Sequence, residues 1–112
     1  YSIKMNRKER RLALKSALSY KVREENLIVV DNIEVASNKT KDMIKVLEEL
    51  NVADKKVLIV MDELTENVIL ASRNLANVLL MEPVELNVLD IVNADVLLLN
   101  KQALNEIEEA LN

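Results

Sequence analysis

Four short aliphatic runs limit the folds open to this chain more than any other feature of its sequence. The runs are Leu27–Val30, Val57–Met61, Val78–Met81 and Val96–Leu99, and a polar residue follows each of them. Because polar and apolar residues do not alternate along the runs, we predict strands that are buried on both faces of a parallel sheet. Ile33–Val35 is predicted to be a further short extended piece.

Segments with helical periodicity separate the four runs. The polar stretch Ser37–Lys41 is predicted to start a helix. The apolar stripe of that helix comprises Met43, Ile44, Leu47 and Leu50. Thr65, Asn87 and Asn100 each stand where a helix cap is expected, and the helix after Thr65 is predicted to run to about Leu75. Strands that alternate with helices in this way predict an α/β layered domain with a mainly parallel sheet of about four strands.

Three missing residue types exclude several kinds of chemistry. The chain has no cysteine and no histidine, so disulfides, thiolate chemistry and the usual general base near neutral pH are excluded. It has no glycine either, which excludes the phosphate loops and nucleophile turns that need a glycine backbone. No apolar run approaches the ~18 residues that a membrane span needs.

The segment Lys4–Arg23 carries most of the positive charge. It holds eight of the 15 basic residues and one acid, Glu9, so residues 1–23 carry +7. Residues 24–112 hold 7 basic and 18 acidic residues and carry −11, which together give the net charge of −4. A domain polarised in this way is expected to have an anionic partner.

The basic segment is predicted to be a helix divided along its length. Asn6 is a plausible N-cap, with Glu9 three positions later as the second half of a capping box. Apolar residues recur at helical spacing at Ala13, Leu14, Ala17, Leu18 and Val22. On a helical projection, Arg7, Arg11 and Lys15 lie nearly above Leu14, Leu18 and Val22. We therefore expect a basic first half that reaches outward and an apolar second half that docks on the core. Leu12 falls on the far side and indicates a second contact surface.

Several partners are compatible with a basic helix. Nucleic acid is favoured, because an almost unopposed charge of this size costs self-repulsion unless an anion such as phosphate neutralises it. A plain solvated helix, an acidic protein and an anionic membrane surface stay open. A helix lying on a membrane would favour Trp or Phe, and the chain has neither. Readout by stacking on single-stranded bases is disfavoured, since Tyr1 and Tyr20 are the only aromatic residues.

The polar residues that end the four strands are candidates for chemistry. Asp31, Asp62, Glu82 and Asn100 would lie at the carboxyl edge of the sheet, where ligands bind in open α/β sheets. Carboxylates there could hold Mg²⁺ or do acid–base work. We favour ordinary turns, because Asp and Asn favour turns and no Lys, Ser or His motif accompanies them. A small α/β interaction domain, or a carboxylate-site metal-dependent enzyme with a basic arm, remains the alternative function.

Five strings in the expected order resemble the bacterial large-subunit ribosomal protein uL4 family. They are KMNRKERRLALKSALS (Lys4–Ser19), LIVVDNIEV (Leu27–Val35), KTK (Lys39–Lys41), ENVILASRNL (Glu66–Leu75) and LNVLDI (Leu86–Ile91). The resemblance covers essentially all 112 residues as the carboxyl-terminal part of the family. Asn38 replaces a proline that is usual before KTK, and Ala71-Ser72 reverses the common order of these two small residues.

The resemblance implies a structural constituent of the large ribosomal subunit in the cytoplasm. Such a protein would bind 23S rRNA, support early subunit assembly and lie near the peptide exit tunnel beside neighbouring ribosomal proteins. The resemblance implies no catalysis, cofactor, metal, membrane or small-molecule substrate. It also implies that residues 1–112 are one partial domain, that an amino-terminal part and a long basic loop are absent, and that residues 4–23 join this loop to the body.

The resemblance implies RNA contacts in three strings. The implied contact residues are Lys4, Arg7, Lys8, Arg10, Arg11 and Lys15 in the first string, Lys39, Thr40 and Lys41 in the second, and Arg73 and Asn74 in the third. A helix amino terminus with two lysines at Lys39–Lys41 would suit a phosphate. For Arg73 an ion pair with a neighbouring acid is an equally open alternative. The acidic residues of the last helix, Glu106, Glu108 and Glu109, are expected to face solvent or a basic protein neighbour.

Overall fold

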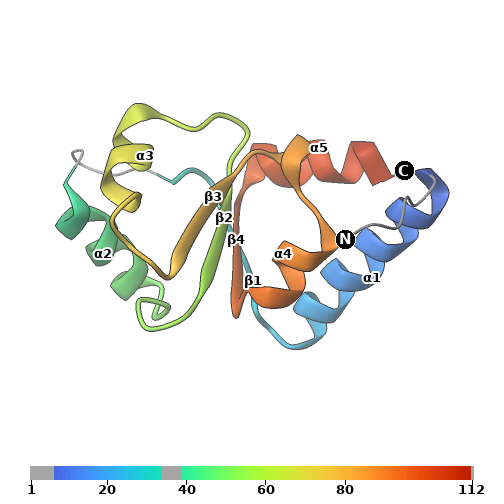
Figure 1. The fold of residues 1–112 in the computed structure, drawn as a ribbon, viewed down its shortest axis with the longest axis horizontal. Helices are drawn as coiled ribbons and strands as arrows, with labels where there is room; N and C mark the ends of the chain where they lie inside the picture. The colour runs from blue at the N-terminus through green and yellow to red at the C-terminus, as the bar shows by residue number, and fades with distance from the viewer. Residues whose placement is uncertain (1–6, 34–38, 112) are drawn as a thin grey trace.

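The computed structural model describes residues 7–33 and 39–111 of the chain, and strands and helices alternate along it (Figure 1). The strands are β1 (Leu27–Val30), β2 (Val57–Val60), β3 (Val78–Met81) and β4 (Val96–Asn100). The helices are α1 (Arg7–Arg23), α2 (Thr40–Glu49), α3 (Glu66–Ser72), the short 3₁₀ helix η1 (Pro83–Glu85), α4 (Val88–Asn93) and α5 (Lys101–Leu111). All four predicted strands are present.

The four strands form one parallel sheet in the order β1-β4-β2-β3. This confirms the predicted α/β class with a parallel sheet. The order itself places the last strand of the chain between the first and the second, which no local pattern indicates. The two central strands, β2 and β4, are buried at every position. Polar and apolar residues do not alternate in these two strands because both faces of the sheet are buried there, as predicted.

Helices cover both faces of the sheet (Figure 1). Helices α2 and α3 lie on one face, and α1, α4 and α5 lie on the other. Because side chains of a strand alternate between the two faces, neighbouring residues of β2 enter different cores. Val57 and Ile59 pack with Met43 of α2, whereas Leu58 and Val60 pack with Ile91 of α4. Each face thus has its own apolar core, and the sheet is shared by both.

The edge strand β1 departs from the prediction. Its sequence predicts burial on both faces, but Val29 is 38% exposed and the other three residues are half-buried. The reason is position, because within residues 7–33 and 39–111 β1 pairs with β4 alone and lies at the edge of the sheet. The extended piece predicted next to it is not confirmed either: Ile33 is buried but belongs to no strand, and residues 34–35 lie outside the described part.

Side-chain caps start three of the helices, as predicted. The Val68 N–H donates to Thr65 Oγ1 (3.4 Å), and the Ala103 N–H donates to Asn100 Oδ1 (2.9 Å). The Asp90 N–H likewise donates to Asn87 Oδ1 (2.9 Å). Each bond satisfies a backbone donor that the first turn leaves without a partner inside the helix. The predicted caps at Asn6 and at 37–38 lie outside the described residues.

Two helix ends differ from the prediction. Helix α3 ends at Ser72 rather than near Leu75, and Leu75 is half-buried beyond it. Helix α2 has Lys39 at its N-cap, where the side chain makes no capping hydrogen bond. Met43 and Leu47 of α2 are buried, which confirms its apolar stripe. Among the described residues, no helix is both long enough and apolar enough to cross a membrane.

In two tight turns a residue other than glycine has a positive φ angle. Glu25 follows α1 with a φ of 59°, and Asn51 follows α2 with a φ of 61°. After α1, the Asn26 N–H donates to Lys21 O (3.0 Å) and the Glu25 N–H to Val22 O (3.1 Å), which is the Schellman arrangement of a helix end. That arrangement favours glycine, because a side chain at positive φ costs about 1–2 kcal/mol. Asn tolerates this region better than Glu.

Candidate nucleic-acid interface

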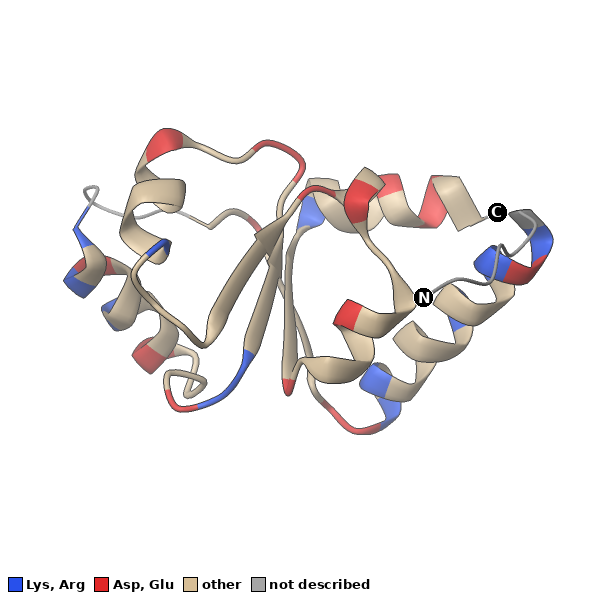
Figure 2. Cartoon of the chain, in the orientation of Figure 1, with Lys and Arg blue, Asp and Glu red and all other residues tan. Residues whose placement is uncertain are grey.

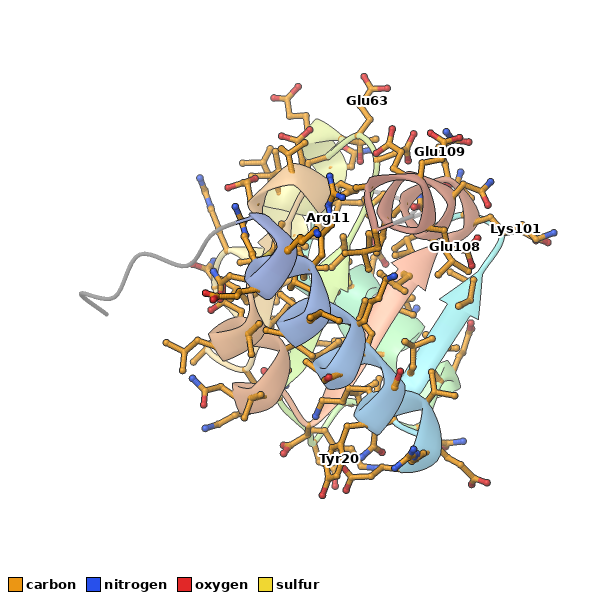
Figure 3. The ribbon with its side chains drawn as sticks, turned by 90° about the vertical axis from the view of Figure 1, so that its right-hand side faces the viewer. Arg11, Tyr20, Glu63, Lys101, Glu108 and Glu109 are labelled. Atoms are coloured by element: carbon orange, nitrogen blue, oxygen red, sulfur yellow. The ribbon has the colours of Figure 1, made fainter. Side chains whose placement is uncertain are left out.

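Helix α1 carries the largest group of predicted contact residues. Lys8, Arg11 and Lys15 are exposed along it. Arg7 is its first residue, whereas Lys4 and the Arg7 side chain lie outside the described part. Figure 3 shows α1 across the front of the molecule, with Arg11 near its beginning and Tyr20 near its end. The predicted outward-reaching basic half is therefore present.

Two cations on the side of α1 that faces α4 donate to backbone carbonyls, one of them, Lys21, buried and the other, Arg10, exposed. An Arg10 guanidinium N–H donates to Leu86 O (3.4 Å), and the Lys21 ammonium donates to Ala94 O. Leu86 directly precedes the cap of α4, and Ala94 is the C-cap of α4. The two side chains thus attach α1 to both ends of α4. A cation at Ala94 also complements the negative end of the α4 dipole.

The role of Lys21 differs from the one that its charge indicates in the sequence. It is only 6% exposed, although its charge was counted with those that face an anion. A helical projection contains the missing signal, because Lys21 falls on the same side of α1 as Leu14 and Ala17. Its ammonium is satisfied by a backbone carbonyl, so this charge stabilises the docked helix instead of facing a partner.

The apolar half of α1 is only partly docked. Ala17 is buried, and Leu14 and Leu18 are half-buried against the core that includes Ile91, which confirms these three. Val22 was expected in the same core, but it is 59% exposed. Around the helix axis, Val22 projects in nearly the same direction as exposed Lys15. This direction lies well to one side of the residues of α1 that face α4. Leu12 is 64% exposed, as expected for a residue on the far side.

The second predicted contact lies on the opposite face of the sheet. Lys39 and Lys41 are exposed and Thr40 is half-buried at the beginning of α2. Because α2 and α1 cover opposite faces, the two basic sites do not form one continuous surface (Figures 1 and 2). Asp42 lies in the first turn of α2, so the site is less positive than the string of two lysines indicates.

The third predicted contact follows α3. Arg73 is the C-cap of this helix, and both Arg73 and Asn74 are exposed. Within the described part of the chain, no carboxylate pairs with Arg73, so the alternative of an ion pair finds no partner there. The chain next enters β3 at its amino end, whereas α2 follows the carboxyl end of β1. The structure thus places the three strings apart from one another.

The acids at the strand ends have protein partners. Asn100 Nδ2 donates to Asp62 Oδ1 (2.6 Å), and Lys101 Nζ lies 3.1 Å from Asp31 Oδ1 in an exposed ion pair. Glu82 is the N-cap of η1, a helix that the sequence reasoning missed. Across residues 7–33 and 39–111, no three acids come together in an arrangement that could hold a metal ion.

Acidic and basic side chains separate on the face that carries α1, α4 and α5. Glu106, Glu108 and Glu109 are exposed on α5, as predicted. Figure 3 shows Glu108 and Glu109 on α5, on the same side of the molecule as Arg11 of α1. The acidic helix and the basic helix therefore lie next to each other as two separate stripes.

Known proteins resemble this chain over nearly its whole length. A family model described as "Ribosomal protein L4/L1 family" matches residues 1–110. The chain is 47% identical over 111 residues to "Large ribosomal subunit protein uL4" of Brevibacillus brevis. It is 46% identical over 111 residues to the proteins of the same name from Onion yellows phytoplasma and Oceanobacillus iheyensis. Each match covers 99% of this chain and 53% of the relative, so the chain spans about half the length of these curated relatives.

Proposed function

Since the chain belongs to the ribosomal protein L4/L1 family, we propose that it is a structural constituent of the large ribosomal subunit and binds 23S rRNA. The resemblance of its strings to the family adds a role in early subunit assembly and a place near the exit tunnel, in the cytoplasm. We propose no catalytic role. Asp31 and Asp62, the best candidates for one, are engaged by Lys101 and Asn100.

The outward side of α1 is the observation that carries the proposal. Lys8, Arg11, Lys15 and Arg23 are exposed on one helix, and none of them has an ion-pair partner among the described residues. From Lys8 to Arg23 the helix rises about 22 Å. Cations on a rigid rod of this length can each contact a phosphate and release its counterions. Arg10 belongs to the predicted contacts, but we propose that it chiefly holds α1 against Leu86.

The other two strings are proposed as separate, weaker contacts. The first N–H groups of α2, with Lys39 and Lys41 beside them, would donate hydrogen bonds to a phosphate. Because α2 and α1 lie on opposite faces, either two rRNA segments bind or one segment passes around the sheet (Figure 1). Arg73 and Asn74 offer a third contact after α3. We further propose that residues 1–112 form one domain and that residues 4–23 join the preceding loop to it.

Neighbouring ribosomal proteins are proposed as the other partners. The exposed acids of α5, at Glu106, Glu108 and Glu109, cannot face phosphate without repulsion. A basic segment of a neighbouring protein would complement them. We therefore propose rRNA as the partner of α1 and a basic protein neighbour as the partner of α5.

Salt dependence of RNA affinity tests the proposal. We expect the affinity for a 23S rRNA transcript to fall steeply between roughly 50 and 200 mM salt. Substitution of Lys8, Arg11 and Lys15 together by Gln should reduce the logarithmic salt slope by about 3 and the affinity by about 100-fold. Filter binding or fluorescence anisotropy measures both quantities.

A matched control removes the same charge elsewhere. Lys45, Lys55 and Lys56 are exposed and belong to none of the proposed contacts. Their joint substitution by Gln should leave the salt slope within about one of the wild type. A flat salt response of the wild-type chain, or equal losses in the two triple variants, would contradict RNA binding through α1.

A further inference from the structure

A shallow hollow on the outer side of α1 takes up side chains that the function described so far does not use. Its volume is about 320 Å³. The residues that line it are Leu12, Lys15, Ser16, Ser19, Tyr20 and Arg23. All six come from α1, and they recur at spacings of three and four residues, so they share one side of the helix. This side is opposite to the one on which Lys21 contacts α4.

Tyr20 is the aromatic feature of this hollow. Its side chain is 61% exposed, although most aromatic rings are largely buried. It lies near the carboxyl end of α1, away from the acidic helix α5 (Figure 3). The helix backbone fixes the place of the ring, so a partner would stack on it at little cost in conformational entropy.

The charge around the ring selects the kind of partner. Lys15 and Arg23 line the hollow, and none of the lining residues is acidic. Glu24 and Glu25 follow directly after Arg23 and limit the basic stripe at this end. Neither Lys15 nor Arg23 has a partner among the described residues. An exposed aromatic ring, with one unpaired cation before it and one after it along the helix, is complementary to a polymer that has both phosphates and aromatic bases.

We propose that one unpaired nucleotide of RNA stacks its base on Tyr20, with its neighbouring phosphates on Lys15 and Arg23. This inference rests on the proposed rRNA binding and names one element of it. The axial rise of the helix separates Tyr20 from Lys15 by about 7.5 Å and from Arg23 by about 4.5 Å, so the two long cationic side chains can reach phosphates on either side of a stacked base. Ser16 and Ser19 line the same hollow, and their hydroxyls can bond to a ribose 2′-OH or a base edge.

A single stack is compatible with the sparse aromatic content. Proteins that read single strands by stacking use several aromatic side chains in a row, and this chain has only two tyrosines. RNA loops and bulges, however, present single unstacked bases. Tyr20 would anchor one such base and set the register of α1 on the RNA, while the lysines and arginines supply most of the affinity.

Substitution of Tyr20 tests the stack. We expect Tyr20→Leu to weaken binding of the 23S rRNA transcript about tenfold without changing the salt slope, because a stack carries no counterion. Tyr20→Phe keeps the ring and should bind within twofold of the wild type. Lys15→Gln should instead lower the slope by about one. Val84→Ala, at a side chain that is 84% exposed elsewhere, should change neither quantity.

Ultraviolet crosslinking of the complex supplies a second measurement. Mass spectrometry of the crosslinked peptides should find an RNA adduct on Tyr20. If Tyr20→Leu binds like the wild type, or if Tyr20→Phe is as weak as Tyr20→Leu, the stack is refuted even though RNA binding stands. If the wild type shows no salt-dependent RNA affinity, the proposed function fails first. A Tyr20→Leu variant that binds RNA normally but loses a ribosomal protein neighbour would make this side a protein-docking surface instead.

Discussion

The two sides of α1 carry the same kinds of residue and use them differently. On the inner side, Arg10 and Lys21 donate to carbonyls at the two ends of α4. On the outer side, Lys15 and Arg23 flank an exposed tyrosine and have no partner within the described residues. The difference teaches that the charge of a basic helix divides into a part that stabilises the fold and a part that is free for a partner. Only the second part contributes to binding an anion.

The largest expected contrast is in stability, between Lys21 and Lys15. Lys21→Met removes the buried donor to Ala94 O, so we expect the free energy of unfolding to fall by about 1–3 kcal/mol. Lys15→Met alters an exposed side chain and should change it by less than about 0.5 kcal/mol. Urea denaturation followed by circular dichroism measures both. Equal effects of the two substitutions would remove the distinction between the sides.

A sharper contrast compares two adjacent arginines. Arg10→Gln should cost about 0.5–1.5 kcal/mol of stability through the lost bond to Leu86 O, and should affect RNA binding little. Arg11→Gln should leave stability within about 0.5 kcal/mol and lower the salt slope of RNA binding by about one. Denaturation and anisotropy on the same preparations test both halves. The reverse pattern would show that Arg10, not Arg11, faces the RNA.

The smallest effect concerns the turn that ends α1, which both sides share. Glu25 has a φ of 59°, so Glu25→Gly should relieve backbone strain in the folded state. Glycine also gives the unfolded chain more conformational freedom, which offsets part of this gain. We therefore expect a net rise of about 0.5–1 kcal/mol in the free energy of unfolding. Glu25→Gln removes the same charge but keeps the strain, and serves as the matched control. Thermal unfolding of the two variants isolates the backbone term. A Gly variant no more stable than the Gln variant would mean that the turn is unstrained.

The elements of the fold were largely predictable because their signals are local. The four aliphatic runs, the caps at Thr65, Asn87 and Asn100, and the stripe of α2 depend on neighbours within four residues. The errors arose where distant contacts decide. Val29 is exposed because its strand lies at the edge of the sheet, and Val22 is exposed because the line of α1 that faces α4 passes through Lys21.

The candidate site was likewise predictable where its signals are local and unpredictable where distant contacts decide. Its basic residues, and the family they resemble, could be identified from order and spacing in the chain. A helical projection places Lys21 on the inner side, but the carbonyls to which Arg10 and Lys21 donate could not be identified. These carbonyls lie 76 and 73 residues away in sequence and meet the two cations only after α1 packs on α4. The separation of the Lys39–Lys41 string from α1 likewise follows from the sheet between them.

The sequence by itself therefore determined which segments become strands and helices, where the positive charge lies along the chain, and the family to which it belongs. The tertiary structure alone decided the strand order and the exposed residues at the sheet edge. It also decided which cations of α1 remain free. The physical reason is that backbone periodicity and capping act between near neighbours in the chain, whereas burial and the pairing of a charge depend on segments that only packing brings together.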